Sequence, residues 1–156
     1  IEKAALQIPV LLSANMSLGV NLMIQLVKSA VKTLYGSYDI EIIEKHHNQK
    51  VDAPSGTALA IADAINSAIA PNHMKYVYDR HSTNQKRTKD EIGIHSVRGG
   101  TITGEHSVIF AGNDEIIEIK HTALSKSLFA EGALKAATFL YDKEPGLYCM
   151  QDLFTE

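Results

Sequence analysis

Apolar residues change their spacing within the first third of the chain, and this change restricts the fold more than any other feature. From Leu18 to Leu34 they recur at helical spacing, and Gly36 supplies a stop signal. From Tyr38 to Lys45 three isoleucines supply the β-branched residues that favour a strand. A helix followed at once by an apolar strand indicates a domain that combines helices with a sheet.

The remaining segments extend this alternation. A helix is expected from Ser55 to about Ala70, and a last amphipathic helix from about Ser127 to Tyr141. Further strands are predicted over residues 8–12, 92–98, 105–111 and 115–122, the last two joined as a hairpin. The polar, cationic residues 79–90 are typical of a solvated, mobile loop. Together these segments predict an α+β fold in which helices cover a mixed sheet.

Composition excludes several functional classes. The chain has 156 residues, 45% of them hydrophobic, which is enough for one compact domain. Its net charge of −3 gives no reason to expect nucleic acid or a membrane as partner. The single cysteine, Cys149, rules out an internal disulfide and favours a reducing compartment, so we expect a cytoplasmic protein. Because residue 1 is isoleucine, we expect the chain to be a piece of a longer protein.

Residues 44–58 carry the side chains best suited to chemistry. Two imidazoles, His46 and His47, stand at the end of a predicted strand, and Lys50 follows in the loop. Ser-Gly-Thr at residues 55–57 then begins a helix, whose free N–H groups and dipole attract anions. Imidazoles exchange protons near neutral pH. The pattern therefore indicates a carboxylate or phosphate site beside a proton-transfer step.

The same residues also have structural explanations. Ser-Gly-Thr at a helix start is usually a cap and nothing more, and a lone histidine is more often structural or exposed than catalytic. Adjacent histidines on a strand point to opposite faces, so His46 and His47 would not readily share a metal ion, and no metal site is expected. On the residues alone, the anion site with its acid and the simple helix cap both stay open.

Resemblance to a known family separates these explanations. The order E-x-H-H-x-x-K-x-D-A-P-S-G-T-A over residues 44–58 resembles the signature of the 4-hydroxy-tetrahydrodipicolinate reductase family, with every fixed position matched. Residues 15–21, N-M-S-L-G-V-N, resemble the family's N-F-S-x-G-V-N. Further similarities lie at residues 97–100, 104–106, 129–133 and 145–148. The resemblance thus spans nearly the whole chain.

The resemblance implies an activity and a set of site residues. Members of the family use NADH or NADPH to reduce a small cyclic 2,6-dicarboxylate, with loss of water, to tetrahydrodipicolinate. By analogy His46 would be the general acid that protonates the ring, and Lys50 would assist proton donation and stabilise charge. His47, Gly56 and Thr57 would hold a substrate carboxylate. The resemblance also implies a homotetramer assembled through the sheets.

Two departures from the family pattern affect the remaining site residues. Ser13, Ala14, Asn15 and Met16 match a loop that touches the nicotinamide end of the cofactor, but the family commonly has an aromatic residue in place of Met16. Lys126 stands where the family has an arginine near the active site. Lysine keeps the charge but loses the two-pronged geometry that grips a carboxylate. An exposed lysine near a helix start is the alternative interpretation of Lys126.

The resemblance also suggests a division into domains. Residues 1–16 are expected to be a remnant of the dinucleotide-binding domain and hinge, 17–140 the substrate-binding and tetramerisation domain, and 141–156 a C-terminal tail. No G-x-G-x-x-G motif opens a helix in this sequence. The chain alone is therefore expected neither to bind NADH or NADPH tightly nor to turn over.

Two other hypotheses remain beside the reductase. One is a non-catalytic module that binds anions or mediates oligomerisation through the same fold. The other is a metal-dependent hydrolase that uses His46 or His47 together with Asp52.

Overall fold

The structure, a computed structural model, describes residues 1–82 and 84–154 and divides the chain into two compact units. The first unit combines the two ends of the chain, Ile1–Gln25 and Ser125–Glu156, and the second is the continuous segment Leu26–Leu124. Helix α2 (Leu18–Leu34) begins in the first unit and ends in the second. The helix expected over these residues is confirmed.

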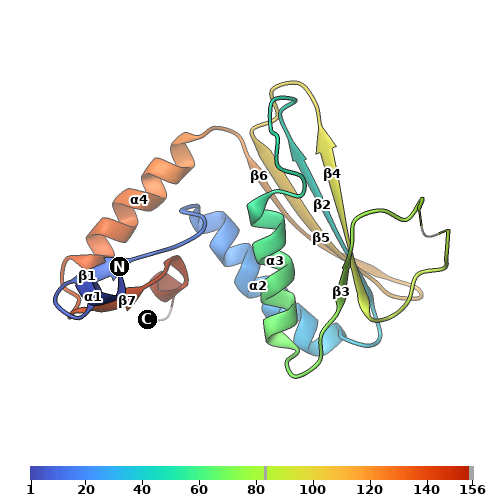
Figure 1. Cartoon of the computed structure of the whole chain (residues 1–156), viewed down its shortest axis with the longest axis horizontal. Coiled ribbons are helices and arrows are strands. Elements are labelled where there is room, and N and C mark those ends of the chain that lie inside the picture. The colour runs from blue at the N-terminus through green and yellow to red at the C-terminus, as the bar shows by residue number, and fades with distance from the viewer. Residues whose placement is uncertain (83, 155–156) are drawn as a thin grey trace. The chain divides into compact units, whose positions relative to one another are not determined.

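A five-stranded mixed sheet in the order β3-β4-β2-β5-β6 is the main element of the second unit (Figure 1). Its strands are β2 (Asp39–His46), β3 (Lys75–Val77), β4 (Glu91–Arg98), β5 (Gly104–Ala111) and β6 (Ile116–Ala123). Strand β2 is parallel to β4 and antiparallel to β5, while β5 and β6 form an antiparallel hairpin. The predicted α+β fold with a mixed sheet is confirmed. Strand β3 was not predicted, because three residues are too few to show alternation.

Helix α3 (Gly56–Ala68) contacts β2 and lies beside the sheet (Figure 1). Two in-register rows of side chains, each at most 2% exposed, form the core of the sheet: Ile92, Ile40 and Phe110, then Ile94, Ile42 and Val108. The next row on the same face is polar and comprises Ser96, Glu44 and His106. The buried face of β2 therefore changes from apolar to polar toward the carboxyl end of the strand.

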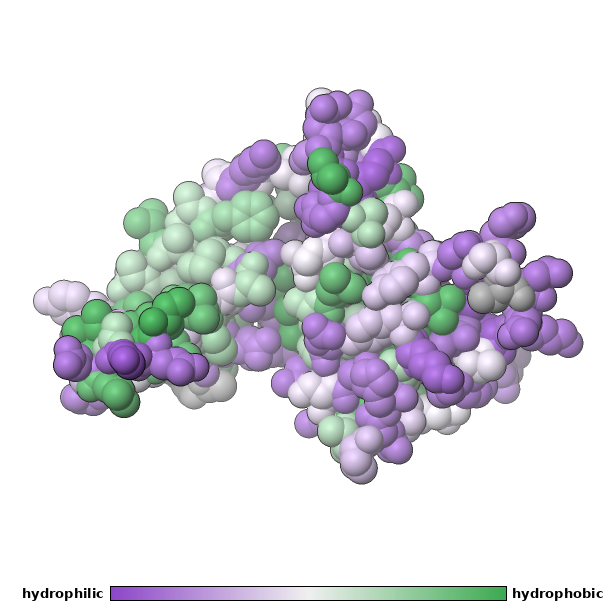
Figure 2. Space-filling model, viewed as in Figure 1, coloured by the Kyte–Doolittle hydropathy of each residue, from purple (hydrophilic) through white to green (hydrophobic). Residues whose placement is uncertain are grey.

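The first unit brings the chain ends together. Its elements are α1 (Glu2–Ala5), β1 (Pro9–Leu11), α4 (Ser127–Leu140), β7 (Gly146–Tyr148) and the 3₁₀ helix η1 (Met150–Phe154). Strand β7 pairs in parallel with β1, so the residues predicted as a C-terminal tail contain a strand and a short helix. Apolar side chains gather on the visible face of this unit, and Leu6, Leu12 and Leu147 are exposed (Figure 2). The functional division at residues 16 and 140 stays a prediction.

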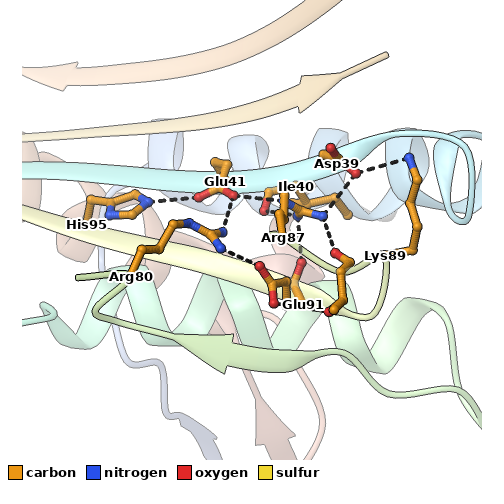
Figure 3. Close-up of polar contacts among 9 residues, drawn as sticks. Asp39, Ile40, Glu41, Arg80, Arg87, Lys89, Glu91 and His95 are labelled. Atoms are coloured by element: carbon orange, nitrogen blue, oxygen red, sulfur yellow. Dashed lines mark hydrogen bonds and ion pairs between the residues drawn. The ribbon is translucent and has the colours of Figure 1, made fainter. Parts of the chain in front are cut away.

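The cationic segment between β3 and β4 is anchored to the sheet (Figure 3). Arg80 Nη2 and Arg87 Nε donate to the same oxygen of Glu41 on β2, at 2.6 and 3.0 Å. The Arg87 side chain also donates to the carbonyl of Ile40 and is only 18% exposed. The prediction of a solvated loop is therefore wrong for these two arginines, since a carboxylate on the sheet draws both of them inward.

No helix in residues 1–82 and 84–154 is both long and apolar enough to cross a membrane.

Candidate active site

Glu44 is a fully buried carboxylate at the polar end of β2. Arg98, from the end of the neighbouring strand β4, donates from both terminal nitrogens to the two carboxylate oxygens, at 2.6 and 2.8 Å. Burial alone would raise the pKa of Glu44, but hydrogen bonds from Arg98, Ser96, His46 and the Ser55 backbone lower it to about 2. Glu44 is therefore ionised at neutral pH, and its charge is neutralised by Arg98.

His46 is held by this carboxylate. Its Nδ1 lies 2.5 Å from Glu44 Oε2, and since a carboxylate only accepts, Nδ1 is the donor. The two residues are neighbours on one face of the strand because side chains alternate with a period of two. On the other side of the ring, a Cβ built on Gly104 would lie 3.2 Å from Nε2. The Glu44 hydrogen bond therefore orients the imidazole, and the absence of a side chain at Gly104 leaves Nε2 uncrowded.

Ser55 connects the same cluster to helix α3. Its backbone N–H donates to Glu44 Oε1 at 3.1 Å, and its hydroxyl oxygen caps the helix by accepting from the Ala58 N–H at 3.2 Å. The hydroxyl also lies 3.0 Å from Nε2 of His106 on β5. Burial, and then the nearby His46, lower the pKa of His106 to about 4, so this imidazole is neutral at pH 7.

The first turn of α3 lies beside this cluster and is open to ligands. Nothing lies within 4 Å of a Cβ built on Gly56, so a ligand could approach the backbone closely there. The first-turn N–H groups and the dipole of a 13-residue helix favour an anion at this end. The site predicted from Gly56 and Thr57 is thus next to Ser55, which binds the carboxylate that holds His46.

Lys50 already binds a carboxylate in this structure. Its ammonium lies 2.8 Å from Asp52 Oδ1 in the loop that leads to α3. The hydrogen bond from Lys50 is the largest of the effects that lower the pKa of Asp52, and a backbone hydrogen bond from Gly56 also contributes. A single exposed carboxylate thus interacts with both Lys50 and the helix start.

The other predicted residues lie elsewhere. His47 follows β2, and its carbonyl accepts from the Lys50 N–H at 3.1 Å, but its side chain has no hydrogen bond or ion pair with the residues that the structure describes. Lys126 precedes α4 in the first unit, and its exposed side chain makes no cap hydrogen bond. Residues 13–16 belong to the first unit as well.

Sequence reasoning missed the residues that organise the site: Glu44, Ser55, Arg98 and His106. All four lie in segments that carry the family resemblance, but Ser55 was interpreted only as a helix cap and the other three had no role. One signal was available in the sequence. Glu44 follows Ile40 and Ile42 at a period of two, which places its carboxylate on a buried face where it requires a cationic partner.

Comparison with known proteins agrees with this architecture. The family model described as dihydrodipicolinate reductase, C-terminus, matches residues 19–154. A solved structure, a dipicolinate-bound dihydrodipicolinate reductase from Paenisporosarcina sp. TG-14, superposes with a TM-score of 0.74 at 26% identity. That superposition covers 91% of this chain and 53% of the solved one.

Two sequence relatives have a higher identity to this chain than that solved structure has. A 4-hydroxy-tetrahydrodipicolinate reductase from Caldanaerobacter subterraneus subsp. tengcongensis is 60% identical over 98% of this chain, and one from Clostridium tetani is 57% identical over 96%. The chain spans 60% and 58%, respectively, of the length of these two relatives. The chain therefore belongs to the 4-hydroxy-tetrahydrodipicolinate (dihydrodipicolinate) reductase family and corresponds to its C-terminal part.

Proposed function

We propose that this chain provides the substrate site and the proton donor for NADH- or NADPH-dependent reduction of 4-hydroxy-tetrahydrodipicolinate to tetrahydrodipicolinate, a step of lysine and diaminopimelate biosynthesis. The observation that carries the proposal is the shared carboxylate Glu44, which binds both His46 and the Ser55 N–H at the start of α3. A proton donor and an anion-attracting helix end are thereby held together. The names of the relatives and the dipicolinate bound by the Paenisporosarcina enzyme support a cyclic dicarboxylate as ligand.

In this proposal the substrate carboxylate takes the place of Asp52. It accepts from the N–H groups of Gly56 and Thr57 and pairs with Lys50, as the Asp52 carboxylate does with Lys50 at 2.8 Å. His47, at the other end of the same loop, would add a further donor. His46 then protonates the ring as it is reduced, and Lys50 stabilises the charge that develops.

Residues 13–16 would contact the nicotinamide. Their backbone suits that role because it is fixed: the Asn15 carbonyl accepts from Ser13 Oγ at 3.1 Å and from Asn21 Nδ2 at 2.8 Å. A Cβ on Gly132 would lie 1.8 Å from the Met16 carbonyl oxygen, so α4 packs tightly under the loop. When bound, NADH or NADPH supplies the reducing equivalents. The phosphate-binding part of a dinucleotide site would lie outside this chain, and we expect no tight binding by the chain alone.

The proposal also covers the role of Lys126, the oligomeric state and the cellular location. Lys126 would contribute a positive charge toward the substrate, in place of the arginine of the family pattern. The protein would form a homotetramer through its sheets and reside in the cytoplasm, as expected of a biosynthetic enzyme with a single free cysteine.

Isothermal titration calorimetry with pyridine-2,6-dicarboxylate, a planar substrate mimic, tests the dicarboxylate site. We expect saturable binding that Lys50→Ala weakens at least about tenfold, since a charge-assisted contact to a carboxylate is lost. Lys89→Ala is the matched control, because Lys89 also pairs with an aspartate, Asp39, at 3.1 Å. Equal weakening by both variants, or no binding to the unchanged chain, would contradict the proposed site.

A further inference from the structure

Strand β2 carries two carboxylates that are bound in similar ways on opposite faces. The first, Glu41, accepts from Arg80, Arg87 and His95 at 2.6, 3.0 and 2.8 Å (Figure 3). These partners come from β4 and from the segment that precedes it. Glu41 therefore fastens Arg80 and Arg87 to the sheet, and the described hydrogen bonds include none from it to the helix start.

The second carboxylate, Glu44, has the same kinds of partner with one addition. It accepts from Arg98 and His46, and it also accepts the N–H of Ser55, the N-cap of α3. Its side chain is 0% exposed, against 21% for Glu41. Glu44 is thus shielded from water and cannot exchange its contact with His46 for one with solvent. Its two oxygens bind two separate parts of the site.

We propose that Glu44 is a positioning residue that fixes the Nδ1–H tautomer of His46 and holds the ring at a set distance from the first turn of α3. The inference rests on the proposed function, in which His46 donates the proton. Arg98 acts through Glu44: it compensates the buried charge and turns the carboxylate so that Oε2 faces Nδ1.

The tautomer decides which atom performs the transfer. Because Nδ1–H donates to Glu44, His46 gives up the proton on Nε2. The Nε2–H bond breaks, and the same proton forms a new bond to the substrate ring. His46 remains as the neutral Nδ1–H form, still donating to Glu44, and regains a proton on Nε2 from solvent. The strongly acidic character of Glu44, whose pKa is about 2, keeps that residue from taking the Nδ1 proton.

Gly104 keeps the side of Nε2 clear. It lies opposite His46 in the antiparallel pairing of β5 with β2, one position beyond the pair of Lys45 with Glu105. A Cβ at this position would come within 3.2 Å of Nε2, which is closer than an ordinary van der Waals contact. The strand pairing therefore leaves space at the atom that transfers the proton.

Charged and titratable groups face His46 from three strands. Glu44 lies on its own strand, Arg98 is its register partner on β4, and the His106 ring lies 5.2 Å away on β5 in an edge-on contact. Burial lowers the pKa of His106, so it contributes no charge at neutral pH. Lys50 adds a positive charge near His106. Among these groups Glu44 is the one that hydrogen-bonds to the His46 ring.

Nitrogen-15 NMR of the histidine rings tests the assignment in this chain. In the unchanged chain at alkaline pH we expect the neutral His46 ring to be protonated at Nδ1. In Glu44→Gln, Arg98 donates to the amide oxygen, so the amide NH₂ faces Nδ1. Nδ1 must then accept a hydrogen bond, and Nε2–H becomes the major tautomer of His46. Glu41→Gln is the matched control and should leave His46 unchanged. An Nδ1–H form of His46 that persists in Glu44→Gln would overturn the inference.

Glu44→Gln leaves the Arg98 charge buried and could prevent folding. The double variant Glu44→Leu/Arg98→Leu removes both charges, leaves no side-chain acceptor at position 44 for Nδ1–H, and is measured in the same way. Loss of the Nδ1–H tautomer in the double variant supports the inference equally, and its retention overturns it.

The same samples separate this inference from the proposed function. Pyridine-2,6-dicarboxylate is titrated into the unchanged chain and into each variant. Binding to the unchanged chain with a His46 tautomer that does not depend on Glu44 contradicts only the positioning role. A Glu44-dependent tautomer without any dicarboxylate binding contradicts only the proposed function.

Discussion

Arg98 on β4 donates hydrogen bonds from both terminal guanidinium nitrogens to Glu44 on the parallel strand β2, at 2.6 and 2.8 Å. Arg98 also donates to the carbonyl of Asp52 at 2.6 Å, in the loop that leads to α3. One side chain therefore neutralises the buried carboxylate and fastens the loop that carries Lys50. The stability of this part of the sheet and the geometry of the site depend on the same contact.

Removing the arginine should destabilise the chain strongly. Arg98→Ala leaves Glu44 buried without its cationic partner, and we expect a loss of about 3 kcal/mol in the free energy of unfolding, measured by urea titration. Lys75→Ala removes an exposed, loose pair with Asp90 at 3.9 Å and should leave the unfolding midpoint unchanged. Equal effects of the two variants would show that the Glu44 pair adds nothing to stability.

Stability should also fall as the pH is lowered from 6.5 toward 4, because of His106. Its ordinary pKa of 6.5 is lowered to about 4 in the folded chain, so in this range protons bind the unfolded form and favour unfolding. The loss is at most about 3 kcal/mol. His106→Gln should flatten the pH dependence of the unfolding free energy over this interval, whereas His81→Gln, at an exposed histidine, should not. An unchanged slope in His106→Gln contradicts a buried, neutral His106.

Glu44 gives a second, more acidic transition. Its pKa falls from 4.5 to about 2 on folding, so its contribution is complete above pH 4.5 and is lost as the pH falls through 2. Circular dichroism of Glu44→Gln should show a smaller loss of stability between pH 4.5 and 2 than the unchanged chain shows. Glu41→Gln, which alters the carboxylate on the opposite face of β2, is measured beside it for comparison. Identical acid transitions in Glu44→Gln and the unchanged chain would contradict the ionised state of Glu44.

Asp52 should compete with a bound dicarboxylate. Its carboxylate pairs with Lys50 at 2.8 Å, so Asp52→Asn should free the ammonium and strengthen binding of pyridine-2,6-dicarboxylate by about threefold. Calorimetric titration measures the change. Weaker binding to Asp52→Asn would instead mean that Asp52 holds Lys50 in the geometry that the ligand needs.

Substitution of Gly93 should be destabilising because of Glu41. A Cβ at Gly93 would lie 1.8 Å from Glu41 Oε2, so Gly93→Ala must displace the carboxylate that binds Arg80 and Arg87. We expect a loss of about 1–3 kcal/mol in unfolding free energy, typical of overpacking. Gly99→Ala is the matched control, since nothing lies within 4 Å of a Cβ there. A neutral Gly93→Ala would show that the anchor can be rearranged without cost.

The parts of the fold that could be predicted are those with long, regular patterns. The helix at Leu18–Leu34 has nearly five turns of periodic apolar residues, and the β5–β6 hairpin has a short turn between two alternating segments. The strand-loop-helix over residues 39–68 could be predicted for the same reason. Strands β3 and β7 have three residues each and form through pairing with a neighbouring strand. Three residues are too few to show a periodic pattern in the sequence.

The candidate site could be proposed from the sequence only where its residues are contiguous. His46, Lys50, Gly56 and Thr57 lie in one segment, whereas Arg98 and His106 reach that segment through strand pairing across about 50 residues. A single sequence contains no signal for that register. The anchoring of Arg80 and Arg87 escaped prediction for the same reason, since their partner Glu41 lies on a distant strand.

The most direct test of the central claim is to map pyridine-2,6-dicarboxylate onto the chain by backbone amide NMR. We predict saturable shifts with one dissociation constant at Gly56 and Thr57, accompanied by a shift of the His46 ring nitrogens. These signals would locate the ligand at the start of α3, beside His46, the proposed proton donor. Shifts confined to other segments, with Gly56, Thr57 and His46 unmoved at saturating ligand, would contradict the account.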